Sequence, residues 1–247
     1  MERSLATKPL TVAIPLYNGF DSLDALGPNQ AFHFAGMNIH LCGPDTTPVR
    51  SFEGVRITPT VSFADCRQVD ILFVPGGSSP MDVFSQNPLD DNLYLKFLTR
   101  QAAGARLVCS VCTGAILLAG AGLLEGHMAT THWAYKPVLR LFPCQVVDDF
   151  RRYVQSGKHV TGAGISSGLD EALYIIGLVS GVNVAREVQL KMQYHPQPPF
   201  HCGDPADIDI QEEPHIVASV MDEWKIEDTR QQVARWIKEQ TNAIHNK

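Results

Sequence analysis

Residues 107–115 read Leu-Val-Cys-Ser-Val-Cys-Thr-Gly-Ala, and this short stretch decides the fold. A buried strand ends here, and a helix expected over 114–121 begins within about three residues. A residue at such a turn projects above the edge of the sheet, and its backbone is often strained, as at the nucleophile elbow of hydrolases. Cys112 occupies that position, so it is the first candidate for chemistry.

The segments around this turn alternate between strand and helix patterns. The spacing predicts strands over 11–17, 38–42, 70–74, 106–109 and 127–131, and hairpins over 49–62 and 152–161. It predicts helices over 30–35, with Pro28 in the first turn, and over 90–103, 114–121, 133–142, 169–179, 182–194 and 227–244. Because several strands are apolar throughout, we expect an α/β fold with a mostly parallel sheet covered on both faces.

Composition limits the possible classes of protein. The 247 residues are 45% hydrophobic and 19% charged, which suits one large α/β domain. We expect that domain over residues 1–205, with a helical extension over 206–247 packed on it. The net charge of -6 does not favour nucleic acid as a partner. No apolar stretch is long enough to cross a membrane and the start lacks a signal-peptide core, so we expect a cytoplasmic protein without a membrane partner.

The six cysteines are expected to be free thiols, since a chain of this size without a secretion signal rarely depends on disulfides. No cluster of cysteine and histidine has the spacing of zinc ligands, so no metal is expected. Cys109 and Cys112 form a C-x-x-C pattern. Cys109 falls inside the strand, however, and core packing explains it better than a redox dithiol does.

Three further positions at strand ends accompany Cys112. The helix after Cys112 supplies unpaired N–H groups, which should lower the pKa of its thiol and hold developing negative charge. Gly76 and Gly77 close the neighbouring strand, either as a cradle of backbone donors or as a tight turn. Asp24 is either a helix-start acid or, near a thiolate that raises its pKa, a proton donor. An inert, buried Cys112 remains the alternative.

Several motifs together carry a resemblance to a known family. They are Ser110–Gly114, Ala121–Gly126 and Ala129–Trp133, supported by Leu23–Pro28, Ser62–Cys66 and Gln193–Phe200. The chain resembles the ThiJ/PfpI superfamily of class I glutamine amidotransferase-like proteins from about residue 11 to 205. Within it, the chain is most similar to the isocyanide hydratases. The resemblance implies a flavodoxin-like three-layer sandwich that forms a homodimer.

The resemblance also implies an activity and roles for single residues. The activity is hydration of an isocyanide, a small molecule, to an N-substituted formamide through a cysteine thioimidate, without a cofactor. The implied roles are nucleophile for Cys112, acid for Asp24, adjacent threonine for Thr113, pocket lining for Ile165 and backbone donors for Gly76 and Gly77. The chain departs from the hydratase pattern at Ala163, where hydratases have glycine, and this departure bears on the substrate.

Two other functions remain open. A glyoxalase-like or deglycase-like enzyme would use the same cysteine, but those branches pair it with glutamate and often histidine, so Asp24 and Thr113 count against it. A ligand-sensing module is the other alternative, since residues 112–133 also resemble amino-terminal domains of AraC-type regulators. The tail after Phe200 is too short and acidic for their two helix-turn-helix motifs. His132 either approaches the site or is a structural histidine.

Overall fold

The computed structural model describes residues 8–86, 91–208 and 213–245, and its centre is a seven-stranded sheet with the order β10-β11-β7-β6-β1-β2-β5. The strands are β1 Thr11–Pro15, β2 Asn38–Gly43, β5 Val61–Ser62, β6 Ile71–Val74, β7 Leu107–Ser110, β10 Tyr153–Ser156 and β11 His159–Gly162. All neighbours pair in parallel except β10 with β11. The expected mostly parallel sheet is confirmed.

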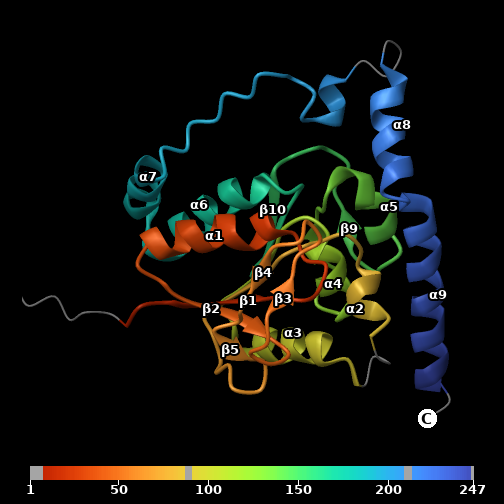
Figure 1. Cartoon of the computed structure of the whole chain (residues 1–247), viewed down its shortest axis with the longest axis horizontal. Helices are drawn as coiled ribbons and strands as arrows, with labels where there is room; N and C mark the ends of the chain where they lie inside the picture. Colours follow the sequence, from red (N-terminus) through yellow and green to blue (C-terminus); the bar gives the residue numbers. More distant parts are fainter. Residues whose placement is uncertain (1–7, 87–90, 209–212, 246–247) are drawn as a thin grey trace, which may run out of the picture.

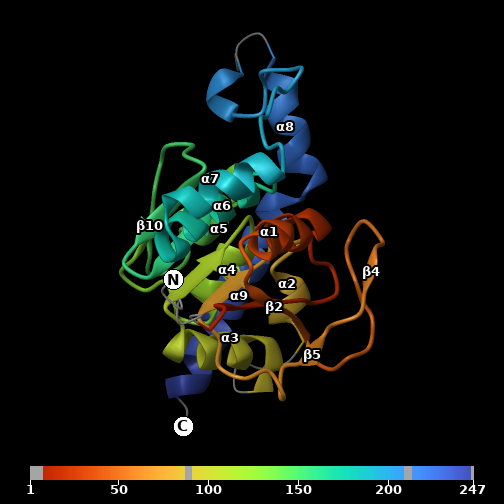
Figure 2. The same ribbon diagram turned by 90° about the vertical axis from the view of Figure 1, so that its left-hand side faces the viewer.

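Helices cover both faces of the sheet (Figure 1). On one face lie α1 (Ser22–Phe34), α6 (Ser167–Ser180) and α7 (Val182–Lys191), and on the other lie α3 (Leu93–Gly104) and α4 (Gly114–Gly120). The same layers are visible after a quarter turn in Figure 2. The innermost strands β6 and β7 are buried at every residue, as expected of strands covered on both faces. The three-layer α/β sandwich is therefore confirmed.

The last two described helices are α8 (Pro214–Glu223) and α9 (Ile226–His245). The sequence predicted α9 but not α8. In Figure 1, α9 runs along one side of the sandwich, next to α2 (Met81–Phe84) and α5 (Lys136–Leu139). Trp236 of α9 stacks on Phe84 with ring centroids 4.2 Å apart and planes 8° from parallel. This apolar contact holds the C-terminal helix against the α/β body.

The first helix begins earlier than predicted. Asp21 caps α1, because its Oδ1 accepts the N–H groups of Leu23 and Asp24 at 2.9 and 3.3 Å. Pro28, expected in the first turn, therefore lies inside the helix. The cap places Asp24 in the first helical turn, directly above the ends of the strands.

Other element boundaries also differ. The strand expected over 127–131 shrinks to β8 (Met128–Ala129), which pairs with β9 (Gln145–Val146) outside the main sheet. The helix expected over 133–142 is a 3-10 turn, Trp133–Tyr135, followed by α5. Only β3 (Val49–Arg50) and β4 (Arg56–Ile57) form the first expected hairpin, because β5 joins β2. The second hairpin, β10 with β11, is confirmed.

Some expectations fall partly outside the described residues. The predicted start of a helix at Asp90 is one of them, and the described helix α3 begins at Leu93. Among the described residues, no helix combines the length and the apolar character that a bilayer crossing requires.

Candidate active site

Cys112 lies on a strained turn between β7 and α4. Its φ of 56° is in the left-handed region, which residues other than glycine rarely adopt. Two hydrogen bonds hold this conformation: the Cys112 N–H donates to the Ala163 carbonyl at 2.7 Å, and the Thr131 hydroxyl donates to the Cys112 carbonyl at 2.7 Å. A Cβ at Gly114 would collide with the Val74 carbonyl, so glycine lets α4 start directly against β6. The predicted elbow is confirmed.

The surroundings of Cys112 contradict one expectation. Cys112 is only 4% exposed, and burial raises the pKa of its thiol well above the ordinary value. The Asp24 carboxylate raises this pKa further, while the N–H of Thr113 opposes the rise. The predicted lowering of the pKa was wrong, because the desolvation of the sulfur outweighs the helix N–H groups.

Asp24 is fully buried. Its Oδ2 accepts the N–H of Gly76 at 2.9 Å, while Oδ1 is buried without a hydrogen-bond partner among the described residues. Burial, and then the charge of Asp21, raise the pKa of Asp24 well above the ordinary value. The raised pKa was predicted, but the cause was not, because the Cys112 side chain acts in the opposite direction and lowers this pKa. Asp24 is therefore suited to hold a proton at neutral pH.

Gly76 and Gly77 donate to side chains of the site. While Gly76 binds Asp24, the N–H of Gly77 donates to Thr113 Oγ1 at 2.9 Å, and that hydroxyl donates back to the Gly77 carbonyl at 3.1 Å. A Cβ at Gly76 would lie 2.5 Å from the Thr113 nitrogen and 2.9 Å from Asp24 Oδ2. The two amides thus position Asp24 and Thr113 and do not form an open cradle for substrate. Thr113, expected only as the threonine adjacent to Cys112, holds Gly77 through its hydroxyl.

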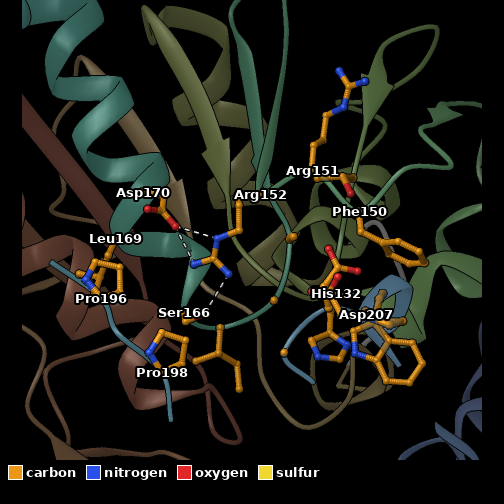
Figure 3. A pocket seen from close by; sticks show the side chains of 18 of the residues that line it. His132, Phe150, Arg151, Arg152, Ser166, Leu169, Asp170, Pro196, Pro198 and Asp207 are labelled. Atoms are coloured by element: carbon orange, nitrogen blue, oxygen red, sulfur yellow. Dashed lines mark hydrogen bonds and ion pairs between the residues drawn. The ribbon is translucent and has the colours of Figure 1, made fainter. Parts of the chain in front are cut away.

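A cavity of about 970 Å³ lies beside the elbow (Figure 3). Ile165 lines it as predicted, and so do Thr131 and Ala163, the two residues that bind the Cys112 backbone. Cys112 is not among the residues that line the cavity. Figure 3 shows Arg152 at one side of the cavity, paired with Asp170 at 2.6 Å. Ala163 therefore both lines the cavity and binds the backbone of Cys112.

His132 lines the cavity, which agrees with the interpretation that it approaches the site. Its Nδ1 accepts the N–H of Ala134 at 3.3 Å, which places the ring proton on Nε2 when the ring is neutral. Burial lowers its pKa to about 4, so the ring is uncharged at neutral pH. Its ring centroid lies 4.7 Å from that of Trp224, the residue after α8. His132 thus links the C-terminal helices to the cavity wall.

Sequence reasoning missed Tyr17 and Thr131. The Tyr17 hydroxyl is buried without a hydrogen-bond partner among the described residues and lies against Gly77. Burial raises its pKa well above the ordinary value, and Tyr94, Asp24 and Cys112 add to the rise. Its one sequence signal was its place at the end of the first predicted strand. Thr131 had the same signal, the end of the strand predicted over 127–131, but its bond to the Cys112 carbonyl depends on tertiary structure. Among the described residues, no group of three or more His, Cys, Asp or Glu side chains is placed to bind a metal.

Comparisons with known proteins identify a family and several relatives. The model of the DJ-1/PfpI family matches residues 10–177. The chain is 39% identical to the isonitrile hydratase of Pseudomonas putida over 197 residues, covering 79% of this chain and 83% of the hydratase. It is 26% identical to the transcriptional regulator CdhR of Pseudomonas aeruginosa over 171 residues, which cover 49% of that regulator. The crystal structure of a ThiJ/PfpI family protein from Pseudomonas syringae superposes with a TM-score of 0.82 at 28% identity, covering 93% of this chain and 90% of that one.

Proposed function

The chain belongs to the DJ-1/PfpI family, and on that premise we propose that it hydrates isocyanides to N-substituted formamides, with Cys112 as the nucleophile. The observation that carries the proposal is the buried Asp24, which the Gly76 N–H holds at 2.9 Å and whose charge, after burial, raises the pKa of the Cys112 thiol. An isocyanide carbon needs both a nucleophile and a proton at the same atom. A thiol beside a carboxyl group that retains its proton supplies both.

In the first half of the reaction, the thiol adds to the terminal carbon of R–N≡C. The sulfur–carbon bond forms while Asp24 delivers a proton to that carbon, and the thiol proton passes to the carboxylate. The product is a thioimidate, R–N=CH–S–Cys112. No net charge is created in the buried site, which suits two groups whose pKa values burial has raised.

In the second half, water adds to the thioimidate carbon and the nitrogen takes up a proton. The tetrahedral intermediate then collapses: the carbon–sulfur bond breaks, the carbonyl of the formamide forms and the sulfur regains its proton. The N–H of Thr113 supports the proposal here, because it favours the thiolate form of Cys112 and stabilises the sulfur as it leaves.

The cavity suggests the class of substrate. Its volume of about 970 Å³ leaves room for a small organic R group, and Trp133, Phe150 and Tyr194 in its wall offer aromatic surface. Because Cys112 is only 4% exposed and is not among the residues that line the cavity, a slender, linear isocyanide group suits the approach better than a branched carbonyl compound. We also propose that the chain works as a homodimer, in line with its family resemblance.

The test is turnover by the purified chain of a panel of alkyl and aryl isocyanides, with methylglyoxal in parallel. We expect mass spectrometry to detect the matching formamides and no lactate from methylglyoxal. Turnover of methylglyoxal without any formamide would favour the glyoxalase-like function and contradict the proposal.

A further inference from the structure

A second pair of sulfur atoms lies away from the elbow. Cys42, at the end of β2, and Cys66, just after β5, have their Sγ atoms 3.5 Å apart, and the Cys42 thiol donates to the Cys66 sulfur. The pair is brought together by the parallel pairing of Cys42 with Val61. Three strand spacings in the sheet order separate β2 from β7, so this pair is roughly 14 Å from the strand that carries Cys112.

Helix α3 surrounds Cys66 with groups that favour a thiolate. The Gln101 amide donates to the Cys66 sulfur at 3.8 Å and to the Arg67 carbonyl at 3.0 Å. The Arg100 guanidinium bonds the carbonyls of Phe63 and Cys66. The hydrogen bond from Cys42, followed by the charge of Arg100, lowers the pKa of Cys66, while the same bond raises the pKa of Cys42. Cys66 is therefore the sulfur that favours the nucleophilic thiolate form, and Cys42 is the one that keeps its proton.

A small oxidant has a short path to Cys66. The side chain of Cys66 is 5% exposed, while its neighbours Asp65 and Arg67 are both exposed on the surface. The pair sits at the edge of the sheet, where β5 is only two residues long. Such short edge segments open locally at small cost in free energy. The sulfur pair is therefore close to solvent but closed to bulky reagents.

We propose that Cys42 and Cys66 form a reversible disulfide when the protein meets a two-electron oxidant of the peroxide class. The 3.5 Å separation means that side-chain rotation and a small backbone adjustment bring the sulfurs to bonding distance. This is a modification site distinct from the proposed catalytic sulfur, and it does not depend on isocyanide chemistry.

The chemistry proceeds in two steps that balance. The Cys66 thiolate attacks one oxygen of hydrogen peroxide, the O–O bond breaks and water leaves after protonation, so that Cys66 becomes a sulfenic acid. The Cys42 sulfur then attacks the Cys66 sulfur, the S–O bond breaks and a second water leaves with the Cys42 proton. The two sulfurs together lose two electrons and the peroxide gains them.

The disulfide would fasten the end of β2 to the loop after β5. It would close a loop of 25 residues (42–66), and constraining the unfolded chain in this way raises the melting temperature by roughly 5–10 °C for a protein of this size. The oxidised form should therefore be the more heat-resistant one, and dithiothreitol should reverse the gain.

The experiment uses the full chain with the substitution Cys112→Ser, so that oxidation of the elbow cysteine does not contribute to the measured mass change. After treatment with hydrogen peroxide, we expect an intact mass lower by about two daltons, a cross-linked peptide joining Cys42 to Cys66, and reversal by dithiothreitol. Cys144→Ser serves as the matched control, since Cys144 is a partly buried cysteine outside the pair. That control should keep the full mass loss.

Two single substitutions sharpen the outcome. Cys66→Ser should abolish the cross-link, and Cys42→Ser should leave a sulfenic acid on Cys66, detected as a mass gain of about 16 daltons that dithiothreitol removes. An unchanged mass in the parent protein under conditions that oxidise a free thiol peptide would overturn the proposal. So would a disulfide that maps to any other cysteine pair.

Discussion

The carboxylate of Asp24 accepts the backbone N–H of Gly76 at 2.9 Å, although the two residues are 52 positions apart in the chain. The bond joins the first turn of α1 to the loop that ends β6, and both elements meet at the carboxyl edge of the parallel sheet. Its neighbour in the chain, Gly77, is fixed by Thr113, the residue after Cys112. Asp24 and the elbow are thereby held together through two adjacent backbone amides.

Replacing Asp24 with Asn keeps the shape of the side chain and removes its acidic carboxyl proton. We expect Asp24→Asn to reduce kcat for formamide formation by about 10²- to 10⁴-fold, because proton delivery to the isocyanide carbon is lost. Steady-state kinetics on one good isocyanide substrate would measure the effect. Unchanged kcat in a folded variant would remove Asp24 from the mechanism.

Gly76 tests the packing of the network. In Gly76→Ala the new methyl group would press on the Thr113 nitrogen and on Asp24, so we expect a loss of about 1–3 kcal/mol in stability together with weaker activity. Thermal melting should show a lower Tm. Gly203→Ala is the matched control, since a Cβ there meets nothing within 4 Å, and its Tm should not move. Equal Tm values for both variants would argue against the close approach.

The buried carboxyl group of Glu171 should make the stability of the protein depend on pH. This residue of α6 is fully buried, both carboxyl oxygens lack a hydrogen-bond partner of good geometry among the described residues, and burial raises its pKa well above the ordinary value, with Asp24 adding to the rise. The folded state then binds the proton more tightly than the unfolded state. The contribution of protonated Glu171 to the free energy of unfolding is fully present below the pKa of the unfolded state, about 4.3. It is lost as the pH rises through the pKa of Glu171 in the folded state.

Glu171→Gln removes that dependence. We expect the variant to gain Tm relative to the parent protein as the pH increases from 5 to 8, because glutamine cannot ionise. Differential scanning fluorimetry at both pH values would measure the gain. A difference in Tm that stays constant over this range would show that Glu171 does not titrate as the buried environment dictates.

Tyr17 offers a change that separates chemistry from folding. Its hydroxyl has no hydrogen-bond partner in the described structure and faces the Asp24–Cys112 site, so Tyr17→Phe should cost no stability but lower kcat by roughly tenfold. Tyr94→Phe is the control, because the Tyr94 hydroxyl bonds the Pro15 carbonyl at 3.1 Å. That control should lower the Tm and leave kcat unchanged. The reverse pattern would place Tyr17 outside the reaction.

The sequence pattern predicted those features that local chemistry sets. The switch from strand to helix around Cys112 located the elbow, and the strand ends located Asp24, Gly76 and Gly77 at one edge of the sheet. The pattern misplaced the start of α1, since the cap formed by Asp21 was stronger than the signal of Pro28. Element boundaries around β8 and α5 also differed, because short segments there take their conformation from packing.

The features that the sequence did not predict depend on burial and on distant contacts. The direction of the Cys112 pKa shift follows from how completely the folded chain covers the sulfur, which no local pattern reports. The engagement of Gly76 and Gly77 with side chains, and the approach of Cys42 to Cys66, arise from the order of the strands. Tertiary packing also determines that the Tyr17 hydroxyl has no hydrogen-bond partner among the described residues.

The most direct measurement compares formamide production by Cys112→Ala and Cys144→Ala on the same isocyanide. Each variant removes one thiol, but only Cys112 lies at the elbow beside Asp24. We expect no formamide above the uncatalysed rate from Cys112→Ala and the full rate from Cys144→Ala, with an isocyanide-sized mass adduct on the parent protein and on Cys144→Ala but not on Cys112→Ala. Full turnover by Cys112→Ala would contradict covalent catalysis by this cysteine.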